Sequence, residues 1–199
     1  DTIISKNSNE VAKLAVGAGI TGANAIMKGK VTSAFALIRP PGHHATPSRG
    51  MGFCIYNNIS IVARYLQHKH GLKRILIVDF DVHHGNGTQE IFYEDNSVFY
   101  FSVHQHPFYP GTGRPSETGS GNGEGFTLNV DLPMGSGDDQ LIKAIKDQLK
   151  PAMNKFKPEF ILVSAGFDAH DGDLLGELNY TSNGYKQVAL ILKNIAQKY

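Results

Sequence analysis

Residues 75–87 read ILIVDFDVHHGNG, an apolar run rich in β-branched residues that leads directly into acids and imidazoles. A continuous apolar run of this kind is typical of a strand buried on both faces of a parallel sheet. Because alternate side chains of an extended chain share a face, we expect Asp79, Asp81 and His83 to point the same way. Ligands of open α/β sheets lie beyond the carboxyl ends of the strands, which is where this cluster falls.

A bound cation is the simplest explanation of this cluster. Two carboxylates buried beside an imidazole cost several kcal/mol for each uncompensated charge, and a metal ion would compensate them. A hydrogen-bonded network of Asp and His without a metal would also satisfy these groups. The stretch alone leaves both interpretations open, so other parts of the chain must decide.

The rest of the chain alternates helices with strands. Apolar periodicity and capping residues predict helices over residues 8–28, 58–70, 87–93, 138–156 and from 181 onward. Strands are predicted over residues 34–38, 97–103, 126–132 and 160–164, beside the central strand. This alternation implies βαβ units, and therefore a three-layer αβα architecture around a mostly parallel sheet. No glycine fingerprint follows the first strand, which disfavours a nucleotide-binding sheet.

Composition excludes several classes of partner. The chain has 199 residues, which fit one domain, and a formal net charge of +1 with scattered Lys and Arg. We therefore expect neither nucleic acid nor a membrane surface as a partner. A single cysteine excludes an internal disulfide framework, and no apolar run reaches about 18 residues. A cytoplasmic location fits these features best.

Two further strand ends carry groups capable of chemistry. The prolines of Arg39-Pro40-Pro41-Gly42 end the strand over 34–38 and stiffen a turn that presents His43 and His44. The strand over 160–164 leads to Asp168. If the strands are parallel, these groups meet the central cluster at one edge of the sheet.

Together, Asp81, His83 and Asp168 offer two carboxylates and one imidazole. Three protein ligands with one position open for water are the layout of a catalytic zinc site rather than a structural one. Such a metal lowers the pKa of its water toward about 7 and polarises a carbonyl oxygen. His43 and His44 are placed to move the proton, so we expect hydrolysis of an amide or an ester.

Five motifs in order carry a resemblance to a known family: RPPGHHA (39–45), MGFCIYNN (51–58), DFDVHHGNGTQ (79–89), YPGTG (109–113) and SAGFDAH (164–170). The chain resembles the zinc-dependent histone deacetylases. The Arg-Pro-Pro lead and Asn86 are similar to the class II branch and to the bacterial histone deacetylase-like amidohydrolases. The resemblance implies the arginase/deacetylase α/β fold and removal of an acetyl group from acetylated lysine or a related acylated amine.

The resemblance also implies roles for individual residues. One Zn²⁺ per chain would be bound by Asp81, His83 and Asp168. His44 would be the general base and would later protonate the leaving amine. His43, paired with Asp79, would act electrostatically. Asn86 would orient His44 where other members place an Asp, so we expect His44 to be less basic here.

The substrate and a second ion have implied sites as well. The residues expected along the acyl-lysine tunnel are Gly52, Phe53, Tyr109 and Leu175. Leu175 stands where polyamine-selective members carry an acidic residue, so we expect acyl-lysine or a neutral acylated amine in preference to a polyamine. A K⁺ site is expected from Asp79, Asp81, His83, Ser102 and Val103.

Two features of the family pattern are not matched. The carbonyl-polarising Tyr or His in a Gly-Gly-Tyr-like motif should follow the last helix, and Tyr199 lacks the glycines. The N-terminal strand and the first active-site loop also lack a counterpart. We therefore expect residues 1–199 to be one deacetylase domain that is incomplete at both ends. Loss of one oxyanion-stabilising donor typically lowers the rate by about 10²–10³.

Two alternative functions stay open. One is a binuclear amidohydrolase of the arginase type, although His83 is followed by His84 and Gly85 where that type would continue with a further carboxylate. The other is a catalytically weak module that binds acyl-lysine, which the missing Tyr motif favours.

Overall fold

A computed structural model of the chain describes residues 2–199 and contains two compact units. Residues 2–73 and 86–91 form the first, called the helical unit here. Residues 74–85 and 92–199 form the second, called the sheet unit. The expectation of one deacetylase domain over residues 1–199 stays a prediction.

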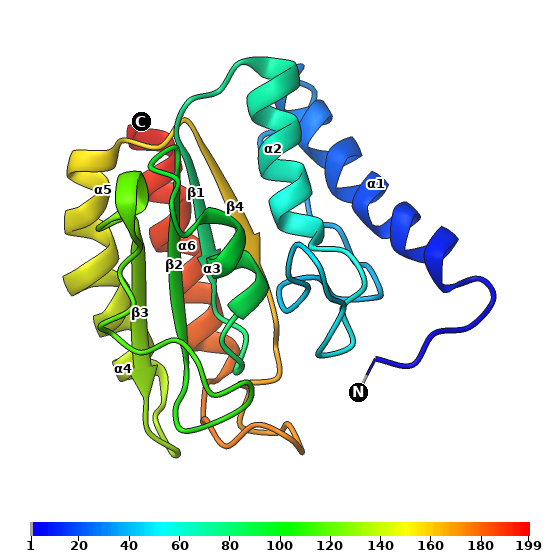
Figure 1. The fold of residues 1–199 in the computed structure, drawn as a ribbon. Helices are drawn as coiled ribbons and strands as arrows, with labels where there is room; N and C mark the ends of the chain where they lie inside the picture. Colours follow the sequence, from blue (N-terminus) through cyan, green and yellow to red (C-terminus); the bar gives the residue numbers. More distant parts are fainter. Residues whose placement is uncertain (1) are drawn as a thin grey trace. The chain divides into compact units, whose positions relative to one another are not determined.

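The helical unit is built on two packed helices, α1 (Ser8–Met27) and α2 (Asn58–His70), shown in Figure 1. The side chain of Asn57 accepts a hydrogen bond from the Ser60 N–H at the start of α2, and Gly71 ends this helix with a φ of 72°. A short helix, α3 (Asn86–Phe92), follows the central motif. Among residues 2–199, no helix combines the length and apolar character that a membrane crossing needs.

The predicted strand over residues 34–38 is wrong for this structure. The segment is irregular, and Phe35 and Leu37 are 69% and 90% exposed. A strand needs a neighbour that accepts and donates its backbone hydrogen bonds. Within the described part of the chain no segment pairs with this one in a sheet.

The sheet unit contains four parallel strands in the order β3-β2-β1-β4, which Figure 1 shows side by side. Their bounds are β1 (Ile75–Asp79), β2 (Val98–Gln105), β3 (Thr127–Leu132) and β4 (Phe160–Ser164). Asp79 is in register with Ser102 of β2 on one side and with Ser164 of β4 on the other. The carboxyl ends of three strands therefore reach one edge together, as the sequence predicted.

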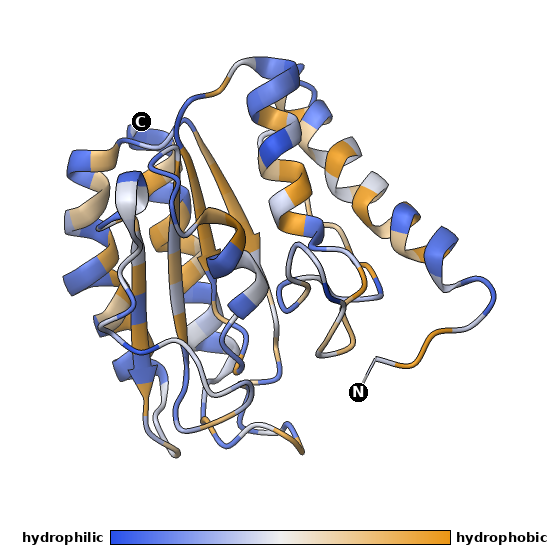
Figure 2. Ribbon diagram, in the orientation of Figure 1, coloured by the Kyte–Doolittle hydropathy of each residue, from blue (hydrophilic) through white to orange (hydrophobic). Residues whose placement is uncertain are grey.

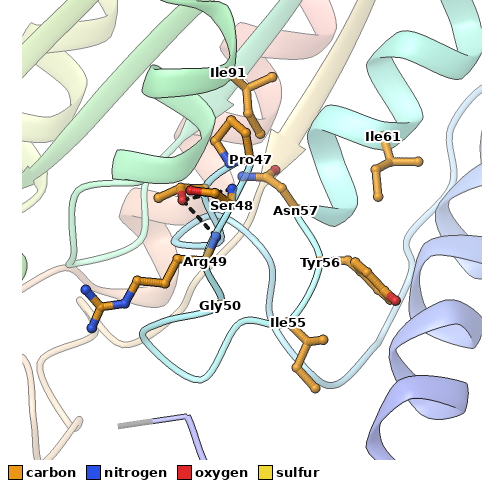
Figure 3. A pocket seen from close by; sticks show the side chains of 10 residues that line it. Pro47, Ser48, Arg49, Gly50, Ile55, Tyr56, Asn57, Ile61 and Ile91 are labelled. Atoms are coloured by element: carbon orange, nitrogen blue, oxygen red, sulfur yellow. Dashed lines mark hydrogen bonds between the residues drawn. The ribbon is translucent and has the colours of Figure 1, made fainter.

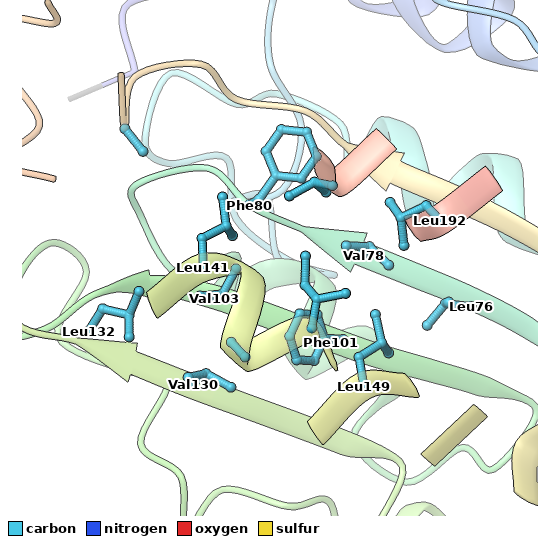
Figure 4. Close-up of a cluster of buried hydrophobic side chains, with 14 of the residues drawn as sticks. Leu76, Val78, Phe80, Phe101, Val103, Val130, Leu132, Leu141, Leu149 and Leu192 are labelled. Atoms are coloured by element: carbon cyan, nitrogen blue, oxygen red, sulfur yellow. The ribbon is translucent and has the colours of Figure 1, made fainter. Parts of the chain in front are cut away.

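One face of the sheet is covered by α4 (Asp138–Ala144), α5 (Lys150–Phe156) and α6 (Ser182–Lys198). A π-helical turn, Ile145–Leu149, joins α4 to α5 within the single helix predicted over 138–156, and a 3₁₀ turn, Gly121–Gly123, precedes β3. Figure 4 shows Val78 and Phe101 of the sheet against Leu149 and Leu192 of the helices. In Figure 2, β1 and β4 are mostly orange, whereas β3 also carries hydrophilic residues, drawn in blue. Burial of these side chains makes the sheet a rigid platform for the loops at its edge.

Candidate metal centre

Three side chains converge beyond the ends of β1 and β4. His83 Nδ1 lies 3.0 Å from Asp81 Oδ1 and 3.0 Å from Asp168 Oδ2. The ligand atoms of these three residues all lie within 4.8 Å of one another, and each residue is partly buried. Donors bound to a tetrahedral ion at about 2.0–2.2 Å are roughly 3.4 Å apart, so small adjustments would let this set bind zinc.

A positive charge would stabilise the two carboxylates of this cluster. Burial disfavours the charged form of His83 and is the largest single influence on it, but the hydrogen bonds and charges of Asp168 and Asp81 together outweigh burial. The pKa of His83 therefore rises to about 9. A proton on His83 between the two carboxylates provides the positive charge that a metal ion would provide when bound.

The backbone holds both carboxylates in place. The His83 N–H donates to Asp81 Oδ1 at 2.8 Å, and the Val82 N–H donates to Asp168 Oδ1 at 3.0 Å. Asp168 therefore turns its other oxygen toward His83. A Cβ on Gly166 would collide with the carboxylate of Asp81, so only glycine fits there without displacing this ligand.

Asp79 lies beneath the cluster at the end of β1 and is fully buried. The Tyr100 hydroxyl donates to Asp79 Oδ2 at 3.3 Å, and the Asp81 N–H donates to Asp79 Oδ1 at 3.3 Å. Burial, followed by the negative charge of Asp79, holds the pKa of Tyr100 well above its usual value, so this phenol stays a donor. Ser102 and Val103 of the expected K⁺ site are fully buried on the neighbouring strand.

Two aromatic side chains contact the imidazole of His83. The ring of Phe108 stacks on it with centroids 5.1 Å apart, and the ring of Tyr109 meets it edge-on at 6.0 Å. Tyr109 is 39% exposed and Leu175 is 70% exposed, which suits residues that meet a substrate. Tyr109 was expected near the tunnel from the sequence, but Phe108 was not among the residues expected there. The pair of aromatic residues that follows a buried strand could have indicated Phe108 as well.

The His pair belongs to the helical unit. His43 and His44 are both buried, with ring centroids 4.0 Å apart. His44 Nδ1 lies 2.8 Å from Asn86 Oδ1, so the structure places Asn86 beside the imidazole that the sequence assigned to it. The backbone oxygen of His43 accepts a hydrogen bond from the Thr88 N–H at 3.1 Å. The pairing of His43 with Asp79 stays a prediction.

A tight turn presents Phe53. The Cys54 N–H donates to the Met51 carbonyl at 2.9 Å, and both central residues, Gly52 and Phe53, have positive φ values of 56° and 63°. A side chain on Gly52 would collide with the ring of His44, so glycine is required. Phe53 has a Cβ atom, so its positive φ strains the backbone. Its side chain is 61% exposed.

A separate pocket of about 390 Å³ lies in the helical unit, on the loop before α2. Figure 3 shows its lining, which includes Pro47, Arg49, Ile55, Tyr56 and Ile61. No residue that the sequence assigned to catalysis, metal or substrate lines this pocket.

Comparison with known proteins decides the family. The family model of the histone deacetylase domain matches residues 1–199, the whole chain. The chain belongs to the histone deacetylase family. This histone deacetylase chain is 50% identical over 188 residues to the rice (Oryza sativa subsp. japonica) protein named Histone deacetylase 10, chloroplastic, and covers 42% of it. It is 46% identical over 199 residues to a probable deacetylase of Archaeoglobus fulgidus and covers 55% of that protein.

Solved structures agree with the family. A crystal structure of the HDA15 HD domain is similar with a TM-score of 0.92 and 45% sequence identity, over 98% of this chain and 58% of that one. This likeness confirms the predicted deacetylase fold with its mostly parallel sheet. The chain thus spans about half the length of these relatives.

Proposed function

We propose that this histone deacetylase chain serves zinc-dependent hydrolysis of the amide bond of acetylated lysine or a related acylated amine. The observation that carries the proposal is the convergence of Asp81, His83 and Asp168 within 4.8 Å in a chain of this family. One Zn²⁺ bound there would polarise the substrate carbonyl and acidify a water molecule. Three protein ligands leave room for both.

The hydrogen bond between His44 and Asn86 suits His44 to proton transfer. Asn86 Oδ1 can only accept, so His44 Nδ1 carries the hydrogen and donates at 2.8 Å. In the neutral imidazole, Nε2 then carries the lone pair that takes a proton from water in this proposal. The same nitrogen returns the proton to the leaving amine. His43, with Asp79, contributes electrostatic stabilisation in this proposal.

The expected tunnel residues suit an uncharged acyl chain. Phe53 and Tyr109 offer aromatic surfaces, Leu175 an aliphatic one, and Gly52 a backbone carbonyl. None of these side chains carries a charge to attract a polyamine, so a neutral acyl-lysine is the proposed substrate class. The buried groups of Asp79 and Ser102 support a K⁺ ion as a structural companion of the site.

Acetate release by the zinc-loaded full-length protein tests the proposal. Turnover of an acetyl-lysine peptide should stop after treatment with a chelator and return when one equivalent of zinc is added. N-acetylputrescine should be a poorer substrate than the peptide. One bound zinc without turnover would favour the acyl-lysine-binding alternative, and two metals per chain would favour the binuclear one.

The cytoplasmic location is also a proposal, since two relatives are named chloroplastic proteins. Imaging of the tagged full-length protein in its own cells would test it, and a signal confined to an organelle would contradict it.

A further inference from the structure

The loop that carries Phe108 and Tyr109 ends at two buried imidazoles of the sheet unit. His84 Nδ1 lies 2.7 Å from the Thr112 hydroxyl, and His104 Nε2 lies 3.0 Å from the Gly113 carbonyl oxygen. His84 and His104 are 1% and 0% exposed, and their rings are 4.8 Å apart. Both side chains thus direct a hydrogen bond to the same short stretch of loop.

The partners of His104 fix its tautomer. A carbonyl oxygen can only accept, so His104 Nε2 carries the hydrogen and donates to Gly113. His104 Nδ1 then accepts from the Ser102 hydroxyl at 2.9 Å. Both ring nitrogens are therefore satisfied by the neutral imidazole.

The loop is shaped to receive the two rings. Gly113 has a φ of 89°, and a Cβ there would collide with His104 and His84. From the other side, the carboxylate of Glu117 accepts from the Gly113 and Arg114 N–H groups, at 3.1 and 2.9 Å. Hydrogen bonds to the Thr112 hydroxyl, the Gly113 carbonyl and the Gly113 and Arg114 N–H groups therefore hold the end of the loop in place.

Apolar side chains would fill the positions of His84 and His104 at lower cost, because a buried imidazole must have its hydrogen bonds satisfied. Both imidazoles instead bond the loop whose aromatic rings contact His83 at 5.1 and 6.0 Å. Thr112 is itself exposed, so its bond to His84 adds little to the packing of the core. These two hydrogen bonds therefore fix the position of the loop.

We propose that His84 and His104 are positioning residues that hold the loop over residues 107–113, so that Phe108 and Tyr109 stand against His83 as the wall of the substrate tunnel. The inference deepens the proposed deacetylation and rests on it. Neither imidazole touches the reacting atoms in this proposal; each acts through Thr112 or Gly113.

Two substitutions at Thr112 test the inference in the zinc-loaded full-length protein. Thr112→Val removes the hydroxyl with little change of shape, and Thr112→Ser keeps it. We expect Thr112→Val to raise the KM for an acetyl-lysine peptide roughly three- to tenfold, the range that loss of one hydrogen bond allows, with kcat within about twofold of wild type. Amide hydrogen exchange over residues 107–113 should become faster, and Thr112→Ser should match the wild type in both readouts.

Several outcomes would overturn the inference. Equal KM values and equal exchange rates for the Val and Ser variants would show that the bond to His84 positions nothing. A lower Tm or lower zinc content in Thr112→Val would show a merely structural bond. If the wild type releases no acetate, the proposed function fails, and hydrogen exchange alone still decides whether the loop is held. His104→Gln, which keeps a donor, should be milder in exchange than His104→Leu, and the reverse order would also contradict the inference.

Discussion

His83 Nδ1 and Asp168 Oδ2 lie 3.0 Å apart although the two residues follow different strands. The register of β1 and β4, in which Asp79 pairs with Ser164, brings the two loops to the same edge. This proximity raises the pKa of His83 to about 9, after the opposing effect of burial is outweighed by Asp168 and Asp81. The proton and a metal ion therefore compete for one nitrogen.

Because a proton and a metal ion compete for His83 Nδ1, we expect zinc binding to release a proton. Below pH 9 the metal-free His83 is mostly protonated, and zinc must displace that proton. Zinc binding near pH 7.5 should release about one proton, and the apparent affinity should rise roughly tenfold per pH unit up to about pH 9. Titration calorimetry in buffers with different ionisation enthalpies measures this release. An affinity that is constant between pH 6.5 and 8.5 would contradict it.

The strained turn at Phe53 predicts a conflict between stability and activity. Asn tolerates a positive φ better than Phe, so Phe53→Asn should raise the free energy of unfolding by about 0.5–1 kcal/mol. Loss of the aromatic surface should lower kcat/KM. Phe53→Leu is the control, because Leu keeps the strain and loses only the ring. Equal stability of the Asn and Leu variants would show that the turn stores no strain.

The close approach of Gly166 to the Asp81 carboxylate predicts that a side chain at position 166 would lower the zinc affinity. In Gly166→Ala the new methyl group would push against the Asp81 carboxylate, so the zinc affinity should fall about 10–100-fold, as it does when a ligand's support is disturbed. Gly17→Ala is the matched control, because Gly17 lies in α1 with no neighbouring atom within 4 Å of the new Cβ. That variant should keep the zinc affinity and gain helix stability. Competition with a fluorescent zinc indicator measures both, and unchanged affinity in Gly166→Ala would refute the contact.

The lowered pKa of His104 predicts that the folded state loses stability in acid. Its pKa is about 4 in the folded state, chiefly because of burial, and near 6.5 when unfolded. The stability that this difference represents is present above pH 6.5, and it is lost as the pH falls toward 4 because the unfolded chain binds a proton first. Between pH 7 and 5 the metal-free wild type should lose about 2 kcal/mol more than His104→Gln does. Urea unfolding at both pH values measures this, and parallel losses would count against a buried neutral His104.

Much of this architecture was predictable because it depends on local patterns. The apolar run of β1 and the order of Asp79, Asp81 and His83 predicted a buried strand with acids and an imidazole gathered at its carboxyl end, and the structure has both; metal binding there stays a prediction. Asp168 followed from the rule that parallel strands end at one edge. These predictions needed only periodicity and the polarity of a sheet.

Other features depended on contacts that no local pattern encodes. The run over residues 34–38 has strand-like composition, yet pairing requires a neighbour, and the described chain supplies none. The role proposed for His84 and His104 depends on a loop that returns to them through Thr112 and Gly113, and no local sequence pattern encodes that return. The φ of 63° at Phe53 also has no signature in the sequence, because Phe is not a residue that favours it.

The most direct test of the metal centre is the X-ray absorption spectrum of the zinc-loaded protein, with the metal content measured on the same sample. We expect one zinc per chain, with nitrogen and oxygen donors at about 2.0–2.2 Å and a single imidazole. The spectrum should lose the imidazole signal in His83→Ala. Two metals per chain, a sulfur donor near 2.3 Å or two imidazoles on one zinc would contradict a site built from Asp81, His83 and Asp168.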